Sequence, residues 1–382
     1  MIGTVADLHE SATRRCGLDD FGIDDYSDGL AALIDSCERD AGLTEAGSRS
    51  MRAMLRGALV ARLLSEVGFA AYPEVSPVSR PVFVTGLPRT GTTFLHRLLV
   101  ADPAAQGLEL WLAEAPQPRP ARSEWDANPA YRIIADGIAR HREANPSFDA
   151  VHEMGADQVE ECWQLLRQVF RSVSYECLAH LPGYSAWLAD QRWELAYQRH
   201  KRNLQLIGQF EADRRWVLKN PSHLFALDAL MSVYPDALVI VTHRAPRVAL
   251  ASMCSLASQA TAGWSTVFRG EVIGRDQLEL WARGLSLFSA ARSRYPAAQF
   301  ADVEYEDLVA DPLAVIERVY GQFGLSLSGA AEDAMRELIP GRTGPGAVRS
   351  AHRYTLADFG LAGEEIDERF TDYRHYDQAH AR

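Results

Sequence analysis

The sequence predicts an α/β fold in which helices flank a parallel β-sheet and a further, mostly helical region is attached. Three observations predict this fold. A strand-like run at 81–85 ends in a glycine-rich turn and enters a helix, because apolar residues then recur at helical spacing. A short apolar strand at 216–218 and a longer one at 238–242 are separated by a helical pattern, as in a βαβ unit. The longer run is apolar almost throughout, which is typical of a parallel strand covered by helices on both faces.

Composition narrows the class of protein. The chain has 382 residues, 47% hydrophobic and 24% charged, so a large core is expected and long disorder is not. The net charge of −12 argues against nucleic acid or an anionic membrane as a partner, since both attract a basic face. There is no apolar run of about 18 residues and no signal-peptide pattern, so no membrane segment is expected. Five scattered cysteines without a C-x-x-C pair are typical of a reduced, cytoplasmic protein.

Helical patterns account for most of the chain outside the sheet. Residues 1–75 alternate apolar helical stretches with acidic turns, and we assign 1–78 to an N-terminal helical region. The main domain is expected at 79–382, with 102–210 as a helical insertion that can act as a lid. Helices are predicted at 129–143, 156–171, 184–209 and 275–293, and another strand at 299–304.

The turn after the first strand is a candidate anion site. Gly86 and Gly91 match the G-x-x-x-x-G spacing of a phosphate loop, and Thr92 and Thr93 add hydroxyl donors. The strand before it and the helix after it make the unit P-loop-like, so backbone N–H groups point at a bound anion. A nucleoside triphosphatase would have lysine at position 92, whereas the only basic residue here is Arg89. We therefore expect a ligand with phosphate-like charge but a different reacting group.

A second anion signal follows the other two strands. Arg244 lies at the end of the 238–242 strand, and Ser252 lies about two turns into the next helix. Lys219 ends the strand at 216–218, and Asn220 can cap the segment that follows. Right-handed crossovers place all the carboxyl ends of these strands on one edge, where open α/β sheets bind ligands. Several cations on one edge of an acidic protein indicate a polyanionic ligand.

These residues together resemble the sulfotransferases that use 3′-phosphoadenosine-5′-phosphosulfate (PAPS). Residues 87–93 resemble the 5′-phosphosulfate loop, whose basic residue is Lys or Arg. Arg244, with Ser252 eight residues later, resembles the 3′-phosphate pair. Tyr305 and the two acidic residues after it resemble the segment whose tyrosine contacts the adenine.

Two further segments, 216–223 and 352–361, are similar to a bacterial branch of that family, and the resemblance runs from about 80 to 375. It implies transfer of a sulfuryl group from PAPS to a hydroxyl, with 3′-phosphoadenosine-5′-phosphate (PAP) as the product and no metal. In this interpretation Arg89 holds the 5′-phosphosulfate with Thr90, Gly91, Thr92 and Thr93. Lys219 stabilises the transferring group, Arg244 and Ser252 bind the 3′-phosphate, and Tyr305 contacts the adenine.

The general base stays open at this point. His152 precedes a predicted helix and falls where this branch places an acceptor-side histidine. His223 is the alternative, although better-known members place their histidine closer to the lysine, at a position that Pro221 occupies here. A carboxylate such as Glu153 or Glu160 is the third candidate. The basic tail residues Arg349, His352 and Arg353 form an exposed loop or close over the 3′-phosphate.

Two other classes of function share parts of this pattern. A P-loop kinase or nucleotide hydrolase would share the strand-loop-helix unit, and a catalytically idle nucleotide-binding protein would share the fold. The expected partner is a small-molecule, lipid or natural-product hydroxyl acceptor, because the region 108–200 is rich in apolar and aromatic residues. The oligomeric state is not predicted.

Overall fold

The computed structural model describes residues 1–144, 155–339, 354–371 and 373. The chain forms two compact units. The first combines Met1–Val78, Leu108–Ala212 and Ala257–Arg269, and the second combines Ser79–Gly107, Asp213–Leu256 and Gly270–Arg382. In the described part of the chain, no helix is long and apolar enough to cross a membrane.

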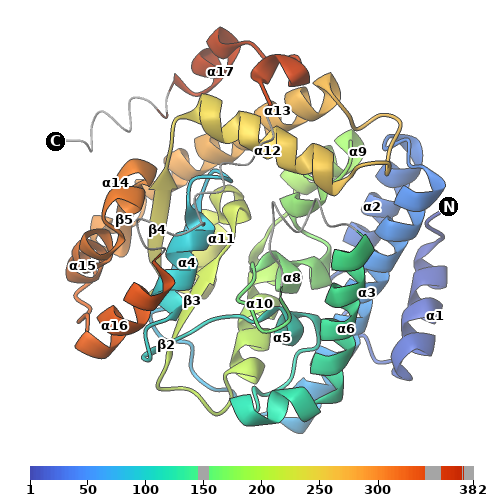
Figure 1. The fold of residues 1–382 in the computed structure, drawn as a ribbon. Helices are drawn as coiled ribbons and strands as arrows, with labels where there is room; N and C mark the ends of the chain where they lie inside the picture. Colours follow the sequence, from blue (N-terminus) through green and yellow to red (C-terminus); the bar gives the residue numbers. More distant parts are fainter. Residues whose placement is uncertain (145–154, 340–353, 372, 374–382) are drawn as a thin grey trace. The chain divides into compact units, whose positions relative to one another are not determined.

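The second unit is built on a five-stranded sheet with the order β2-β3-β1-β4-β5 (Figure 1). All of its neighbouring strands run parallel. The strands are β1 (Val82–Gly86), β2 (Ala105–Gln106), β3 (Arg215–Lys219), β4 (Leu238–His243) and β5 (Phe300–Glu304). Every residue of β1 and β4 is buried, as expected for parallel strands covered on both faces. The predicted fold class is confirmed.

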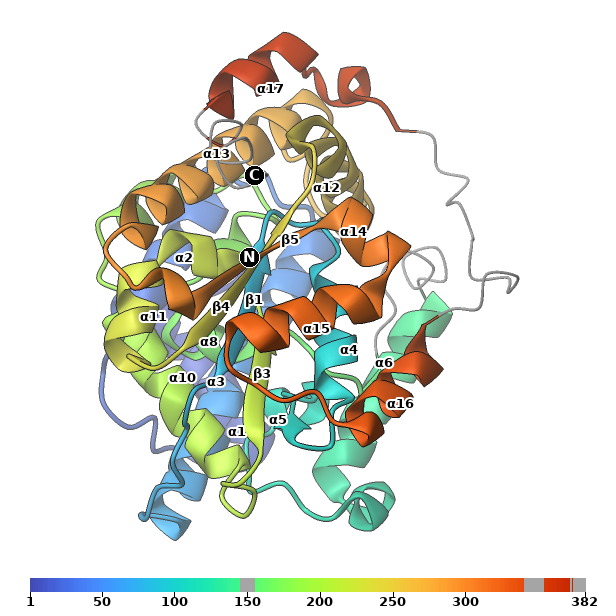
Figure 2. The same cartoon turned by 90° about the vertical axis from the view of Figure 1, so that its left-hand side faces the viewer.

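Helices cover both faces of this sheet (Figure 2). One apolar core joins β1 and β4 to α4 (Thr92–Val100), α15 (Pro312–Gln322) and α16 (Gly329–Leu338). On the other face lie α11 (Leu227–Val233) and α13 (Glu271–Arg292). Aromatic side chains pack on this second face. The ring centre of Phe83 on β1 lies 5.2 Å from that of Tyr234, and the ring centre of Phe288 on α13 lies 6.3 Å from that of Phe300.

The remaining elements of the second unit connect or follow the strands. They are the 3-10 helix η4 (Pro221–Phe225), α12 (Pro246–Ala260, in this unit up to Leu256), η5 (Ala297–Gln299), α14 (Tyr305–Ala310), η6 (Leu356–Phe359) and α17 (Gly363–Arg369). Asn220 caps η4 by accepting a hydrogen bond from the backbone N–H of Ser222 at 3.2 Å. Pro221 follows at the first position, where its fixed φ suits the start of a helix.

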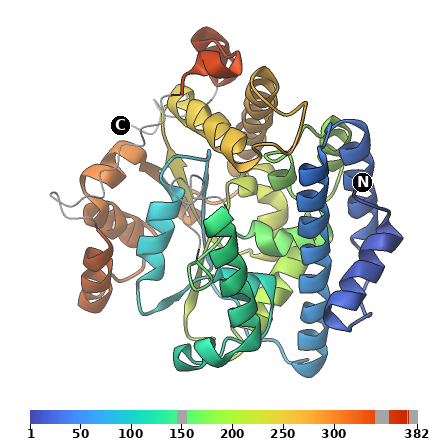
Figure 3. The same cartoon turned by 45° about the vertical axis from the view of Figure 1, so that its right-hand side comes forward.

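The first unit is helical. Its helices are α1 (Val5–Cys16), α2 (Ser27–Arg39), α3 (Glu45–Ala71), α5 (Leu110–Glu114), α6 (Pro129–Ala144), α8 (Trp163–Leu166), α9 (Pro182–Ala189) and α10 (Glu194–Ile207). Short 3-10 helices lie at η1 (Arg122–Ala127), η2 (Arg167–Val169) and η3 (Val173–Tyr175). The helices of the first 71 residues, in blue, lie side by side in Figure 3, and α1 packs on α3.

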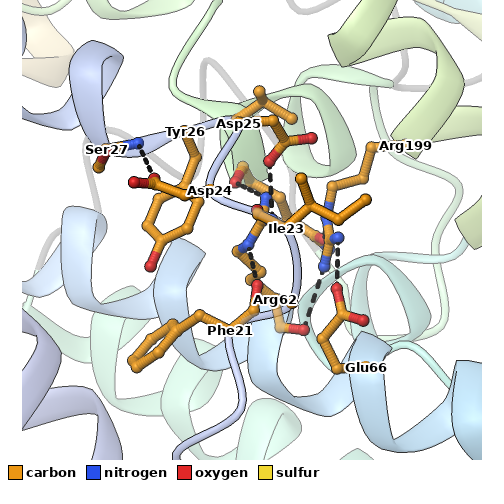
Figure 4. Close-up of polar contacts among 12 residues, drawn as sticks. Phe21, Ile23, Asp24, Asp25, Tyr26, Ser27, Arg62, Glu66 and Arg199 are labelled. Atoms are coloured by element: carbon orange, nitrogen blue, oxygen red, sulfur yellow. Dashed lines mark hydrogen bonds and ion pairs between the residues drawn. The ribbon is translucent and has the colours of Figure 1, made fainter.

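A buried arginine holds the loop between α1 and α2 against α3 (Figure 4). Arg62 of α3 is fully buried and donates hydrogen bonds to the carbonyl oxygens of Phe21 and Ile23 at 2.7 and 2.5 Å. It also forms an ion pair with Asp25 at 2.7 Å. Arg199 of α10 lies beside it, and burial together with the charge of Arg62 lowers the pKa of Arg199 to about 10. The loop is therefore fixed by polar contacts inside the unit.

Two predicted helices differ from the structure. The helix predicted at 156–171 is wrong, because the backbone of Ala156, Gln158 and Glu160 forms hydrogen bonds with residues 108–111 instead. Only α8 and the 3-10 turn after it are helical there. The helix predicted at 184–209 is interrupted, since α9 ends at Ala189 and α10 begins at Glu194. The helix predicted at 129–143 is confirmed as α6. The domain boundaries 1–78, 79–382 and 102–210 stay predictions.

Candidate functional site

The register of the strands brings the predicted loop and cations to one edge of the sheet. Gly86 of β1 pairs with Thr242 of β4, and Val84 pairs with Lys219 of β3. The strands are parallel, so the turn after β1, Lys219 and Arg244 all lie at the carboxyl edge, as predicted.

The two glycines of the loop are required by its shape. Gly86 has φ 138° and Gly91 has φ 87°, a region that favours glycine. A Cβ on Gly86 would clash with the carbonyl oxygen of Thr242, and one on Gly91 would lie 3.1 Å from the ring of Tyr305. Gly91 is also the N-cap residue of α4 and offers no side chain to its first turn. The backbone N–H groups of that turn therefore lack a side-chain partner from the N-cap.

The hydroxyl groups of two threonines, Thr85 and Thr90, connect the end of β1 and the loop to neighbouring segments of the sheet. Thr90 is fully buried and its Oγ1 lies 2.6 Å from the carbonyl oxygen of Leu87 and 2.5 Å from Oγ1 of Thr242. On the other side, the hydroxyl of Thr85 donates to the carbonyl oxygen of Asn220 at 3.0 Å. These hydrogen bonds tie the loop to β4, and tie the end of β1 to the residue after β3.

Arg89 lies in the middle of this loop with φ 70°. A left-handed backbone at a residue other than glycine costs about 1–3 kcal/mol and is found more often at functional sites. Nε of Arg89 donates to the hydroxyl of Ser252 on α12 at 3.0 Å. Arg244 donates to the carbonyl oxygen of Arg89 at 2.9 Å, and its guanidinium lies 3.9 Å from the centre of the Tyr305 ring. Four residues that the sequence singled out are thus in direct contact.

This cluster carries uncompensated positive charge. Among the residues that the structure describes, neither Arg89 nor Arg244 forms an ion pair with a carboxylate. Burial lowers the pKa of Arg89, and the neighbouring charge of Arg244 lowers it further. Two arginines joined through the carbonyl oxygen of Arg89, beside the first turn of a helix, make this cluster a candidate site for an anion.

Lys219 lies at the end of β3 and is 3% exposed. The two residues that follow it closely, Asn220 and Ser222, are each 1% exposed. In the described part of the chain, Nδ2 of Asn220 and Oγ of Ser222 have no hydrogen-bond partner. Buried polar atoms without a partner are uncommon and can mark a place where a ligand or water binds.

The structure describes only some of the candidates for the general base. His152 and Glu153 lie outside the described residues, as do Arg349, His352 and Arg353. His223 is 1% exposed, and its ring meets the edge of Phe83 at 5.0 Å. Oε1 of Glu160 accepts a hydrogen bond from the backbone N–H of Glu161 at 2.9 Å in the first unit. No choice among these candidates follows.

Sequence reasoning missed Thr242, Ser222 and the unpartnered amide of Asn220. Thr242 follows four apolar residues of β4 beside the loop, and that polar residue was the available signal. Asn220 was assigned only as a cap, and nothing in the sequence distinguishes its second amide atom. No group of three or more His, Cys, Asp or Glu residues in the described ranges is arranged to hold a metal ion.

Comparison with known families identifies the family of the chain. The model of the family described as "Sulfotransferase family" matches residues 81–329, which include β1, the loop, Lys219, Arg244 and Tyr305. The chain belongs to the sulfotransferase family. The resemblance found in the sequence is confirmed.

Solved sulfotransferases share the whole fold. The crystal structure of sulfotransferase STF1 from Mycobacterium tuberculosis H37Rv is 54% identical, with a TM-score of 0.91, covering 97% of this chain and 99% of that one. Sulfotransferase STF9 from Mycobacterium avium is 28% identical with a TM-score of 0.83, covering 97% of this chain and 95% of that one.

A curated relative carries a more specific name. It is the omega-hydroxy-beta-dihydromenaquinone-9 sulfotransferase Stf3 of Mycobacterium bovis, 28% identical over 254 residues. That match covers 64% of this sulfotransferase and 63% of the relative's length, so the chain spans less than two thirds of that relative.

Proposed function

We propose that this sulfotransferase transfers a sulfuryl group from PAPS to a hydroxyl group of a small-molecule acceptor. The observation that carries the proposal is the contact between Arg89 and Arg244 at the carboxyl edge of the sheet, with Ser252 and the start of α4 beside it. PAPS carries about four negative charges over its phosphosulfate and 3′-phosphate groups, and a cationic site can bind both without a triphosphate–magnesium complex.

The residues divide between the two ends of the donor. Arg89, Thr90, Gly91, Thr92 and Thr93 hold the 5′-phosphosulfate, because the loop directs N–H and hydroxyl groups at an anion. Arg244 and Ser252 bind the 3′-phosphate, which distinguishes PAPS from ATP. Tyr305 contacts the adenine, and its position against Arg244 and Gly91 supports placing the nucleoside there.

Transfer proceeds in line. The acceptor oxygen attacks sulfur as the bond between sulfur and the bridging oxygen of the 5′-phosphate breaks, and PAP leaves. Arg89 neutralises the charge that develops on the leaving oxygen, and the planar guanidinium can bind two oxygens at once. Lys219, buried at the end of β3, stabilises the equatorial oxygens of the transferring group. The protein's contribution is positioning and electrostatic stabilisation.

The proton of the acceptor hydroxyl passes to a general base. His152 is our first candidate, and His223 or a carboxylate such as Glu153 or Glu160 is the alternative. The acceptor is a small-molecule hydroxyl compound, a lipid or natural product; the name of Stf3, with a hydroxylated menaquinone as acceptor, supports this class. The cytoplasmic location stays a prediction from composition.

Calorimetric titration tests the donor assignment. PAP, ATP, ADP and 5′-AMP are titrated separately, each with and without magnesium. We expect tight binding of PAP that does not require magnesium and that depends on the 3′-phosphate. Preference for ATP with magnesium would overturn the proposal and favour a kinase or hydrolase. Tight PAP binding without transfer to any of a panel of alcohols would indicate an idle nucleotide-binding protein.

A further inference from the structure

The carboxyl end of β4 carries a chain of side chains that the proposed donor contacts do not use. His243, the last residue of β4, is 2% exposed. Its Nε2 lies 2.7 Å from the carboxylate of Asp302 on β5, and its Nδ1 lies 2.9 Å from the hydroxyl of Tyr373. Arg292, at the end of α13, donates two hydrogen bonds to Asp302 at 2.9 and 2.7 Å. This network of hydrogen bonds therefore connects β4, β5, α13 and the C-terminal segment.

The charge of Asp302 sets the direction of these hydrogen bonds. Burial alone would raise the pKa of Asp302, but the hydrogen bond from His243 and the charge of Arg292 hold that pKa below its ordinary value. The carboxylate is thus ionised at neutral pH and can only accept, so Nε2 of His243 carries a hydrogen. The other ring nitrogen, Nδ1, forms a hydrogen bond with the hydroxyl of Tyr373, in which either group can be the donor.

The C-terminal segment is attached beside the donor loop at two further points. Nε of Arg247, near the start of α12, donates to Asp367 at 2.9 Å. Phe370 is 2% exposed and lines a narrow cavity with Leu87 and Pro88 of the loop. Asp367, Phe370 and Tyr373 are spaced three residues apart. Asp367 and Tyr373 contact Arg247 and His243, which lie on either side of Arg244, and Phe370 lies beside the loop at 86–93.

Arg244 lies between two of these attachments. His243 precedes it and is held by Tyr373 and Asp302, and Arg247 follows it and is held by Asp367. We propose that His243 and Tyr373 are positioning residues of the donor site, which fix the turn that carries Arg244. This inference rests on the proposed function, in which Arg244 binds the 3′-phosphate. The ring of Tyr373 packs on that of His243 at 5.5 Å, so packing and hydrogen bonding act together.

The variant Tyr373→Phe tests the proposal, because it removes one hydroxyl and keeps the ring. We expect the dissociation constant for PAP, measured by calorimetry, to rise about 3- to 10-fold, the usual effect of one lost hydrogen bond. The affinity for 5′-AMP, which lacks the 3′-phosphate, should change by less than about twofold. The selectivity for PAP over 5′-AMP therefore falls, which a general loss of stability would not produce.

Tyr320→Phe is the matched control. Tyr320 is 7% exposed and donates to Asp102 at 2.9 Å, but it lies near the amino ends of the strands, away from the donor loop. It should lose stability as Tyr373→Phe does and keep the wild-type selectivity. Unchanged selectivity in Tyr373→Phe, or an equal loss for PAP and 5′-AMP, would overturn the inference while leaving the donor assignment intact. Failure of the unaltered protein to bind PAP would instead reject the proposed function itself.

Discussion

Nε of Arg89 lies 3.0 Å from the hydroxyl of Ser252, although 163 positions separate the two residues in the chain. This hydrogen bond joins the loop proposed for the 5′-phosphosulfate to the helix proposed for the 3′-phosphate. Because the guanidinium of Arg89 links the loop to α12, substitution of Arg89 or Ser252 should weaken binding of both the 5′-phosphosulfate and the 3′-phosphate.

Substitution of Arg89 tests the catalytic assignment. We predict that Arg89→Ala lowers turnover about 100- to 1000-fold, the usual effect of removing one donor that stabilises developing negative charge. Arg89→Lys keeps the charge but loses the planar fork, so its activity should fall between those of the alanine variant and the unaltered protein. Transfer from radiolabelled PAPS to a panel of lipidic and aromatic alcohols measures this. The exposed Arg294 provides a control, since Arg294→Ala should keep full activity.

Substitution of Arg244 tests recognition of the 3′-phosphate. Arg244→Ala should weaken PAP binding about 10- to 100-fold, because a charge-assisted contact is lost, and should leave 5′-AMP binding nearly unchanged. Calorimetry with the two nucleotides measures both values. Equal PAP affinity in the variant and the unaltered protein would remove Arg244 from the proposed 3′-phosphate site.

The general base is tested by a pair of variants. His152→Ala should depress turnover strongly with little loss of PAP affinity, and the rising limb of the pH–rate profile should disappear. His223→Gln should keep that limb, because a buried ring against Phe83 is then a packing residue. The reverse result would transfer the role to His223. Full activity in both variants would indicate a carboxylate such as Glu160.

A buried histidine predicts how stability changes with pH. Burial, reinforced by the charge of Lys219, lowers the pKa of His96 on α4 to about 3. The ring contacts the carbonyl oxygen of Val217 at 3.1 Å, and in the described residues Nδ1 has no hydrogen-bond partner. Because the unfolded chain binds the proton more readily, the contribution of His96 to stability is complete above pH 6.5. It falls toward pH 3 by about 1.4 kcal/mol per pH unit.

Urea unfolding between pH 7 and pH 4 checks this prediction. In His96→Gln the free energy of unfolding should decline less steeply with falling pH, by about one proton's worth of slope. Identical slopes in His96→Gln and the unaltered protein would mean that His96 does not contribute to acid sensitivity.

Substitution of the buried Arg62 should destabilise the first unit strongly. Arg62→Met removes the guanidinium that donates to the carbonyl oxygens of Phe21 and Ile23, and it leaves Asp25 without its ion pair. We therefore expect the free energy of unfolding to fall by about 3–5 kcal/mol. Arg49 on the same helix is exposed and pairs with Glu45, and Arg49→Ala should cost no more than about 0.5 kcal/mol. Chemical denaturation of both variants measures the difference.

The sequence was sufficient for the elements that carry the site. The strands that end at Gly86 and Lys219, and the strand that Arg244 follows, could be predicted because apolar runs and turn residues are local signals. Parallel strands then bring their carboxyl ends together. The hydrogen bond from Arg89 to Ser252 and the hydroxyl pair of Thr90 and Thr242 could not be predicted. They depend on side-chain geometry between distant segments.

The helix wrongly predicted at 156–171 also shows that contacts between distant segments cannot be predicted from local patterns. Its apolar residues recur at helical spacing, yet Ala156, Gln158 and Glu160 pair with residues 108–111. A competing partner for the backbone decides the structure there, and hydrophobic periodicity contains no information about it. The same reasoning explains why Asp302 and Tyr373, which contact His243 across long stretches of chain, were not singled out.

The contacts of Thr85, at the end of β1, and of Thr90, within the loop at 86–93, bear on the rate at which ligand binds. A loop that is already ordered loses little conformational entropy when an anion arrives, since that entropy was lost when the protein folded. Association of PAP should then proceed in one kinetic phase, with a rate set by diffusion and by attraction between the phosphates and the two arginines. Salt should slow that association much more than it speeds dissociation.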